Sequence, residues 1–107
     1  LKHGTISLIE EGTLVVALAS YVKLFDKTMS NVKEVKARGA RVLGVALEGN
    51  RAIYSEADDV ILVPRMDDLF VVPAEIVPLQ LFAYYVAKAN GCAIDKPKNL
   101  AKSVTVE

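Results

Sequence analysis

Few side chains in this sequence are of types that do unusual chemistry. The single histidine is His3, the single cysteine is Cys92, and Lys102 is the last lysine, just before a Ser-Val-Thr-Val run. An imidazole titrates near neutral pH and can move protons, and a deprotonated lysine amine can attack a ketone. Their spacing forms no recognisable Ser-His-Asp triad. Residue type alone predicts that His3 and Lys102 are solvent-exposed and that Cys92 is a small residue beside a helix end.

Motifs for phosphate, nucleotide and metal binding are absent from the sequence. The stretch "GARVLGVALEGN" contains glycines, but their spacing is neither that of a dinucleotide fingerprint nor that of a P-loop. No cysteines and histidines have metal-ligand spacing. Thirteen basic and thirteen acidic residues leave no net charge, and no basic stripe is present. We therefore predict no metal, no cofactor and no nucleic-acid partner.

Length and composition predict one domain or part of one, because 52% of the 107 residues are hydrophobic. A lone cysteine favours a reducing, cytoplasmic setting. The N-terminal residues lack a signal-peptide pattern, and no apolar run approaches the roughly 20 residues that span a bilayer. We therefore expect no membrane partner. A chain that opens on leucine is expected to be a piece of a longer protein.

Three short apolar runs predict strands. They are "TLVVALAS" (13–20), "RVLGVAL" (41–47) and "DVILVP" (59–64), and each is almost continuously apolar. Runs of this kind are typical of strands buried on both faces of a parallel sheet that is covered by helices. We predict strands near 13–18, 41–46 and 59–63.

Helical signals lie between and after these runs. Apolar residues recur at helical spacing from Phe25 to Val35, and Gly39 follows as a C-cap, which predicts a helix near 24–38. Residues 48–59 read as a loop with one helical turn. A second helix is predicted near 78–90, starting at Pro78 and ending before Gly91. It is apolar almost all round, which predicts burial against its own sheet and another chain or domain.

The alternation of strands and helices predicts an α/β fold with a parallel sheet. Three strands make a narrow sheet, which favours further strands upstream. On these observations alone the function stays open.

Two segments, one at each end of the sequence, resemble those of a known family. They are "LKHG" (1–4) and "VPLQLFAYYVAKANGCAIDKPKNLAKSVTVE" (77–107), in which "PKNLAKSVTVE" is the most specific part. Over its whole length the sequence resembles the C-terminal part of the glutamine–fructose-6-phosphate aminotransferase (isomerizing), or glucosamine-6-phosphate synthase, family. The resemblance implies a three-layer α-β-α SIS (sugar isomerase) domain with a parallel sheet, truncated at its N-terminal side. Residues 1–107 would be the C-terminal part of the second SIS subdomain, with an extended active-site tail at about 92–107.

The resemblance assigns roles to three residues. It implies that Lys102 forms a Schiff base with open-chain fructose 6-phosphate, from which ammonia displaces it on the way to glucosamine 6-phosphate. It implies that His3 opens the sugar ring and reaches the site of a neighbouring subunit, so that the protein is a homodimer. The backbone of Ala101 would lie along the sugar. Further implied partners are an upstream glutaminase domain and a first SIS domain, in the cytoplasm.

Parts of the family's machinery are absent from these residues. Its general-base glutamate and its phosphate-binding loops precede the "KHG" segment, and Glu10 and Glu11 match no motif for that base. Thr5 stands where the family usually has proline. The chain alone is therefore expected to be inactive. Two alternatives remain open: a non-catalytic SIS module for sugar-phosphate binding or dimerisation, and another SIS enzyme such as a phosphosugar isomerase or deglycase.

Overall fold

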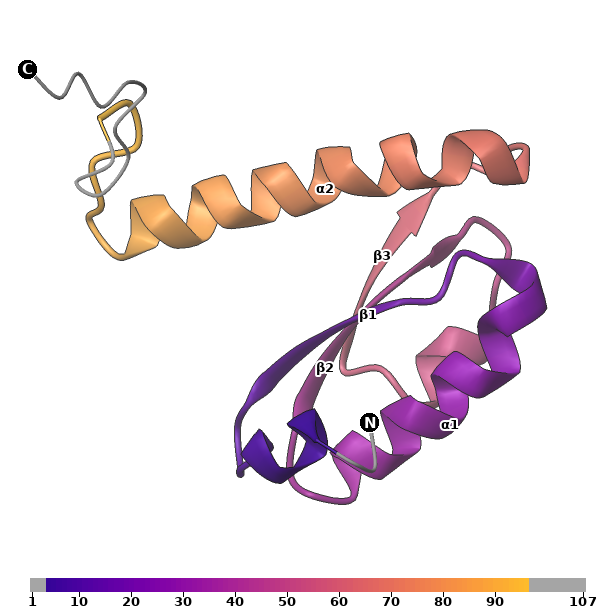
Figure 1. Ribbon diagram of the computed structural model, residues 1–107. Coiled ribbons are helices and arrows are strands. Elements are labelled where there is room, and N and C mark those ends of the chain that lie inside the picture. Colours follow the sequence, from indigo (N-terminus) through magenta and orange to yellow (C-terminus); the bar gives the residue numbers. More distant parts are fainter. Residues whose placement is uncertain (1–3, 97–107) are drawn as a thin grey trace, which may run out of the picture. The chain divides into compact units, whose positions relative to one another are not determined.

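A sheet of three parallel strands, in the order β1-β2-β3, forms the frame of the protein (Figure 1). The computed structural model describes residues 4–96. Strand β1 is Leu14–Leu18, β2 is Arg41–Leu47 and β3 is Asp59–Val63. All pairings are parallel, with Leu18 opposite Val45 and Leu47 opposite Val63. The predicted strands and the α/β class with a parallel sheet are confirmed.

Helical segments connect and flank the strands. The short helix η1 (Thr5–Leu8) precedes β1, and η2 (Val22–Leu24) leads into α1 (Phe25–Lys36), which connects β1 to β2. The short helix η3 (Ala52–Ser55) lies between β2 and β3. It confirms the predicted loop with one helical turn. The long helix α2 (Asp68–Ala89) follows β3.

The hydrophobic core lies between one face of the sheet and the helices α1 and η3 (Figure 1). Strand residues that alternate along β1 and β2 contribute to it, because successive side chains of a strand point to opposite faces. Its buried members are Ala17, Ala19, Met29, Val32, Val35, Ala40, Val42, Ala46 and Ile53. The helical spacing of Met29, Val32 and Val35 therefore predicted the buried side of α1 correctly.

The short helix η3 packs closely on the sheet at Gly44, in the middle of β2. A Cβ atom added there would lie 2.8 Å from Ile53 Cγ1 and 2.9 Å from Ile53 Cδ1. The Ile53 side chain is fully buried, so it has no free space into which to move. Glycine at position 44 therefore lets η3 pack directly on the strand.

The second face of the sheet is covered unevenly. Its β2 residues Leu43, Val45 and Leu47 are buried, whereas Leu14 and Leu18 of β1 are exposed. The prediction that every strand is buried on both faces is therefore wrong for β1 within residues 4–96. Strand β2 is central, whereas β1 forms a sheet edge, so composition alone did not distinguish their environments.

Glycine ends both long helices in the same way. After α1, the N–H of Gly39 donates to the carbonyl of Lys36 and the N–H of Ala40 donates to that of Val35. Gly39 has φ +87°, the left-handed conformation that this Schellman motif requires. After α2, Gly91 has φ +68°. The N–H of Cys92 donates to the carbonyl of Ala87 there, so this exposed cysteine does lie beside a helix end.

Helix α2 begins ten residues before the predicted start at Pro78, so that prediction is wrong. Asp67 caps the helix, because its Oδ1 accepts the N–H of Leu69 at 3.0 Å. Pro73 and Pro78 lie inside the helix. Each removes one backbone hydrogen bond, but a proline does not fix where a helix starts when an N-cap precedes it.

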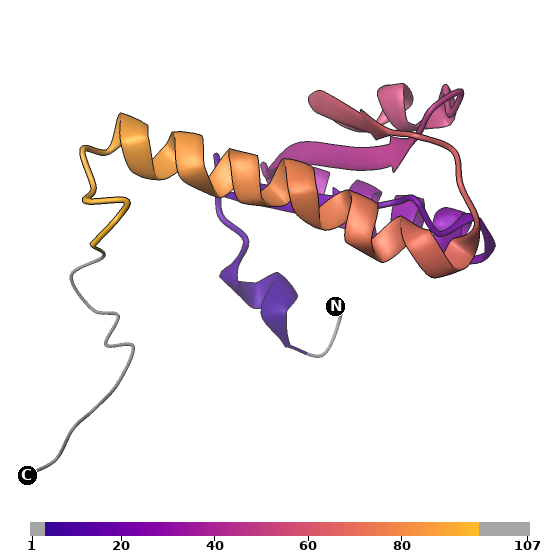
Figure 2. The same ribbon diagram turned by 90° about the horizontal axis from the view of Figure 1, so that it is seen from above.

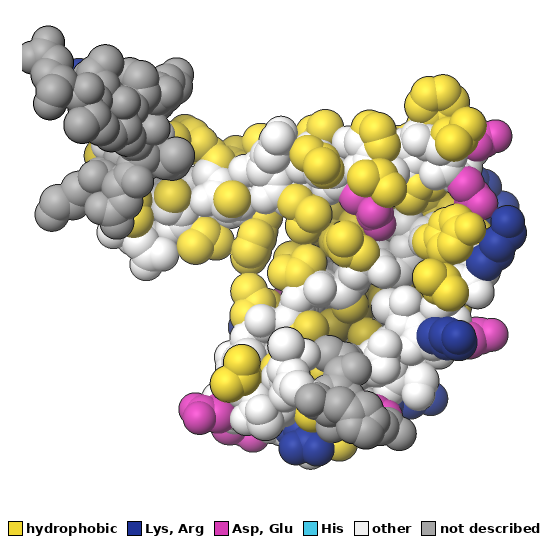
Figure 3. Space-filling model, in the orientation of Figure 1, with side chains coloured by type: hydrophobic (Ala, Val, Ile, Leu, Met, Phe, Trp, Pro, Cys, Tyr) yellow, Lys and Arg dark blue, Asp and Glu magenta, His cyan; other side chains and the backbone are white. Residues whose placement is uncertain are grey.

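The boundary between two compact units of the chain falls within α2. The units are residues 1–75 and 76–107. The helix is continuous (Figure 2), and apolar side chains run along it (Figure 3). Large exposed side chains in its second unit include Val77, Leu81 and Tyr85. The predicted burial of this helix against its own sheet and another chain or domain stays a prediction.

By length and composition alone, α2 is long and apolar enough to cross a membrane. Its most apolar 18-residue window has a mean hydropathy of 1.6 and is 11% buried. The sequence prediction concerned uninterrupted apolar runs, and it is not contradicted, because polar residues divide this helix. The helix also carries Glu75, which is buried, and Gln80.

We predict that Gly44→Ala destabilises the protein by about 1–3 kcal/mol, because the added methyl group overlaps Ile53. The measurement is the free energy of unfolding in denaturant. Ile53→Val removes the Cδ1 atom and is itself expected to cost about 0.5–1.5 kcal/mol. The double variant should lose less stability than the sum of the two single variants. Strict additivity would contradict the proposed contact.

Candidate functional site

The three site residues predicted from the sequence lie outside the described residues. His3 precedes residue 4, and Ala101 and Lys102 follow residue 96. Most of the predicted active-site tail, about 92–107, lies there too. Their roles therefore stay predictions, and the candidate site within residues 4–96 is a different one.

A cavity of about 360 Å³ lies where the three parallel strands end. Ser20 follows the end of β1, Asn50 the end of β2 and Arg65 the end of β3, and all three line the cavity. In open parallel α/β sheets, ligands bind at the carboxyl ends of the strands. The cavity therefore occupies the expected position for a binding site in this fold.

Hydrogen bonds between the strand ends hold the wall of this cavity in place. The carbonyl of Val45 accepts both the N–H of Ala19, at 2.7 Å, and the hydroxyl of Ser20, at 3.3 Å. The N–H of Glu48 donates to the carbonyl of Val63 at 2.8 Å. These bonds join β1 to β2 and β2 to β3 at the level of the cavity.

A tight turn after β2 places Asn50. The N–H of Asn50 donates to the carbonyl of Leu47 at 3.0 Å, and Gly49 has φ +83°, as the third position of a type II turn requires. The Asn50 side chain is then fixed, because its Oδ1 accepts the N–H of Ile53 at 3.2 Å. The core residue Ile53 is thus connected to the cavity through Asn50.

The lining combines an apolar wall with four polar side chains. Ser20 is buried, Asn50 is half-buried, and Asp26 and Arg65 are exposed. Apolar members of the lining are Ala19, Val22, Phe25 and Leu47. Sequence reasoning missed the polar residues. Their positions just after the predicted strands, at the edge where ligands bind, were the available signal.

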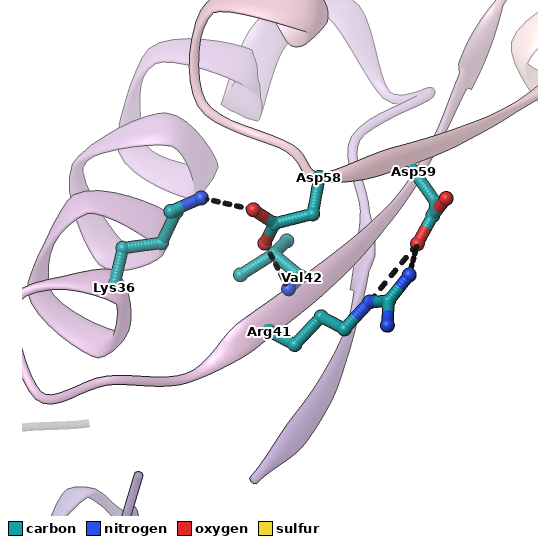
Figure 4. A network of polar contacts seen from close by, with 5 residues as sticks. All are labelled: Lys36, Arg41, Val42, Asp58 and Asp59. Atoms are coloured by element: carbon teal, nitrogen blue, oxygen red, sulfur yellow. Dashed lines mark hydrogen bonds and ion pairs between the residues drawn. The ribbon is translucent and has the colours of Figure 1, made fainter. Parts of the chain in front are cut away.

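A polar network lies at the opposite, amino-terminal ends of β2 and β3 (Figure 4). One Asp58 oxygen accepts from Lys36 Nζ at 2.6 Å, and the other accepts the N–H of Val42 at 2.7 Å. The neighbouring Asp59 pairs with Arg41, whose Nη2 is 2.9 Å from Oδ2. This network links α1, β2 and β3.

The network lowers the pKa of Asp58 below its ordinary value of 3.8. The main cause is the hydrogen bond from Lys36, followed by that from the N–H of Val42, because both favour the ionised carboxylate. Partial removal from water acts in the opposite direction and is outweighed. The arrangement suits a structural role, since both carboxylate oxygens of Asp58 accept hydrogen bonds from other parts of the fold.

No group of three or more His, Cys, Asp or Glu side chains within residues 4–96 is placed to hold a metal ion.

Comparison with known proteins assigns the fold to a family. Residues 1–89 match the SIS domain. The chain belongs to the SIS domain family. The match includes the whole of α2, so we take this apolar helix as part of the SIS domain.

Curated relatives of this SIS domain share about half of its residues. The glutamine–fructose-6-phosphate aminotransferase (isomerizing) of Clostridium acetobutylicum is 55% identical over 107 residues, which are 100% of this chain and 18% of the relative. The protein of the same name from Thermus thermophilus is 50% identical, with the same coverage. That of Methanosarcina acetivorans is 53% identical over 107 residues, all of this chain and 17% of the relative. The chain thus spans less than a fifth of these relatives.

A solved structure agrees with this assignment. The C-terminal domain of glucosamine-fructose-6-phosphate aminotransferase from Francisella tularensis matches with a TM-score of 0.77 and 30% identity. The match covers 90% of this chain and 27% of that one. The SIS fold predicted from the resemblance is confirmed.

We predict that Asp58→Asn lowers the unfolding temperature at pH 7 and that the difference from the unchanged protein narrows below about pH 4. The folded-state pKa of Asp58 is lowered. Its contribution to the free energy of unfolding is therefore complete above the unfolded-state pKa and is lost as the pH falls through the folded-state pKa.

The matched control is Asp59→Asn, one residue further along. Within residues 4–96, the Asp59 side chain pairs with the exposed Arg41 side chain alone and accepts no backbone N–H. At pH 7, Asp59→Asn should lower the unfolding temperature by less than Asp58→Asn does. If Asp58→Asn lowers the unfolding temperature equally at pH 3 and pH 7, ionisation of Asp58 does not contribute to stability.

Proposed function

We propose that this SIS domain is the C-terminal isomerase part of a glutamine–fructose-6-phosphate aminotransferase, which makes glucosamine 6-phosphate from fructose 6-phosphate and glutamine. The supporting observation is the 55% identity to such an enzyme over all 107 residues. Both ends of the chain, with His3 and Lys102, lie inside the aligned range. In this proposal the chain is the C-terminal part of the second SIS subdomain, and about 92–107 is its active-site tail.

Lys102 is the nucleophile of the proposed reaction. Its amine attacks the ketone of open-chain fructose 6-phosphate and forms a Schiff base with loss of water, and ammonia then displaces the lysine. Partial removal from water lowers the proton affinity of such an amine and so favours attack. The imidazole of His3 transfers the proton that opens the sugar ring, and the backbone of Ala101 lies along the sugar.

The rest of the machinery belongs to other parts of the proposed enzyme. An upstream glutaminase domain releases ammonia from glutamine, and the first SIS domain binds the sugar phosphate. The general base also lies upstream of residue 1. The 107-residue chain alone is therefore inactive in this proposal, and the full-length enzyme works in the cytoplasm.

Lys102→Arg in the full-length enzyme should abolish the synthesis of glucosamine 6-phosphate and leave glutamine hydrolysis at least partly intact. Arginine keeps the positive charge but is effectively never deprotonated, so it cannot attack the ketone. The measurements are product formation, glutamate release, and borohydride trapping with fructose 6-phosphate. Trapping should label the unchanged enzyme at Lys102 and leave the variant unlabelled.

Near-normal synthesis by Lys102→Arg would contradict the Schiff-base role. A full-length protein that binds sugar phosphate but is not trapped and releases no glutamate would instead support the non-catalytic SIS module. Trapping without use of glutamine would favour another SIS enzyme, such as an isomerase or deglycase.

The proposal includes a homodimer, since His3 would act in the site of the neighbouring subunit. Exposed apolar side chains on α2, among them Leu81 at 52% and Tyr85 at 62% of their surface, are consistent with a covered face. Exposed apolar area of this extent favours association in water.

Light scattering at micromolar concentration should give at least twice the monomer mass for the chain. Leu81→Lys should reduce association, because it places a charge among apolar groups. The control Gln80→Lys adds the same charge at an exposed polar position of the same helix and should change the mass little. A clean monomer mass for the unchanged chain would contradict self-association.

A further inference from the structure

Asn90 is followed directly by Gly91 at the point where α2 ends, and both residues are exposed. The side-chain carbonyl carbon of an asparagine can be attacked by the backbone nitrogen of the next residue, and this attack closes a five-membered imide ring. A side chain on the next residue hinders the attack, whereas glycine has none. The pair therefore has the residue types that this ring closure needs.

The surroundings of Gly91 are open. A Cβ atom added to it would have no heavy atom of another element within 4 Å. The corresponding glycine after α1 is enclosed, because a Cβ atom on Gly39 would meet Glu11, and the carbonyl of Gly39 accepts the N–H of Gly12 at 2.8 Å. Opening the end of α2 therefore meets less resistance than opening the end of α1.

Two hydrogen bonds must break before the ring can close. The N–H of Gly91 donates to the carbonyl of Lys88 at 3.1 Å, and Nδ2 of Asn90 donates to the carbonyl of Val86 at 3.0 Å. These residues are all exposed, so opening the last turn uncovers little additional apolar surface. Helix ends of this kind open locally at a small free-energy cost. The closed turn therefore slows the reaction but does not prevent it.

We propose that Asn90 is a site of spontaneous deamidation, which proceeds when the last turn of α2 opens. The Gly91 nitrogen bonds to Cγ of Asn90 and the Cγ–Nδ2 bond breaks. The amide nitrogen leaves as ammonia, together with the proton that the Gly91 nitrogen loses. Water then opens the imide ring. Cleavage at Cγ gives an aspartate, and cleavage at the main-chain carbonyl carbon gives an isoaspartate, in which the backbone runs through the former side chain.

Either product weakens the end of α2. The donor to the carbonyl of Val86 is lost, and the new carboxylate lies at the negative end of the helix dipole, which is unfavourable. An isoaspartate also lengthens the backbone just before residues 92–107. The consequence for activity rests on the proposed function: where residues 92–107 form the active-site tail, the modified enzyme positions this tail differently and loses synthesis with age.

The test is peptide mapping by mass spectrometry of the folded 107-residue chain during incubation at mildly alkaline pH, with an enzymatic assay for isoaspartate. Asn90 should gain the mass difference between a hydroxyl and an amino group. The rate should rise with hydroxide concentration, because the attacking nitrogen must lose its proton. Asn31 and Asn50 are internal controls that should stay unmodified, because Val32 and Arg51 follow them.

The variants separate the chemistry from the opening of the helix. Asn90→Gln keeps the amide donor but should abolish modification, because its ring would be larger and closes far more slowly. Lys88→Gly should speed the modification of Asn90 about threefold, since glycine favours opening of the last turn. Lys27→Gly is the matched control, because Lys27 is also an exposed helical lysine but lies in α1, and it should leave the rate unchanged.

The proposal is wrong if Asn90 stays intact in the folded chain under conditions that modify it in denaturant. Equal rates in Lys88→Gly and Lys27→Gly would overturn the role of helix opening. In the full-length enzyme, ageing should reduce the synthesis of glucosamine 6-phosphate, and Asn90→Gln should slow this loss. An equal decline in both enzymes would overturn the effect on the tail. Modification of Asn90 in a full-length protein that has no synthase activity when fresh would contradict the proposed function and leave the modification site standing.

Discussion

Parallel pairing of β2 with strands on both of its sides is the constraint on which the rest of the structure depends. Parallel neighbours cannot be joined by a tight turn, so each connection must cross the sheet. The connections here carry α1 and η3, and both pack on the same face to form the core. The same pairing places the amino ends of all three strands at one end of the sheet and their carboxyl ends at the opposite end.

Polar side chains have different roles at the two ends of the strands. At the amino ends, both carboxylate oxygens of Asp58 accept hydrogen bonds, from Lys36 and from the N–H of Val42, so this group contributes to the fold. At the carboxyl ends, backbone bonds hold the strands together, while Arg65 and Asp26 line a cavity and have no ion pair within residues 4–96. Satisfied polar groups stabilise a fold, whereas unsatisfied ones at a cavity are suited to bind a molecule.

The apolar surface is consistent with a domain that belongs to a larger assembly. One side of β1 exposes Leu14 and Leu18, and α2 exposes apolar residues along most of its length. The curated relatives are more than five times as long as this chain, so they contain much additional protein that such surfaces can contact. The activity proposed above for the full-length enzyme also needs groups from those other parts.

The sequence by itself determined the three strands, the extent of α1, the glycine caps at Gly39 and Gly91, and the family. Continuous apolar runs, helical spacing and glycine after a helix are local signals, and each was confirmed. The start of α2 also has a local signal, the N-cap Asp67. The prolines that follow it in the sequence wrongly indicated a later start. Only the tertiary structure decided that Gly44 must be glycine, because the reason is the approach of Ile53 from another element. Likewise, only the tertiary structure brought Asp26, Asn50 and Arg65 to one cavity, since strand pairing across sequence separations sets their proximity and no local pattern records it.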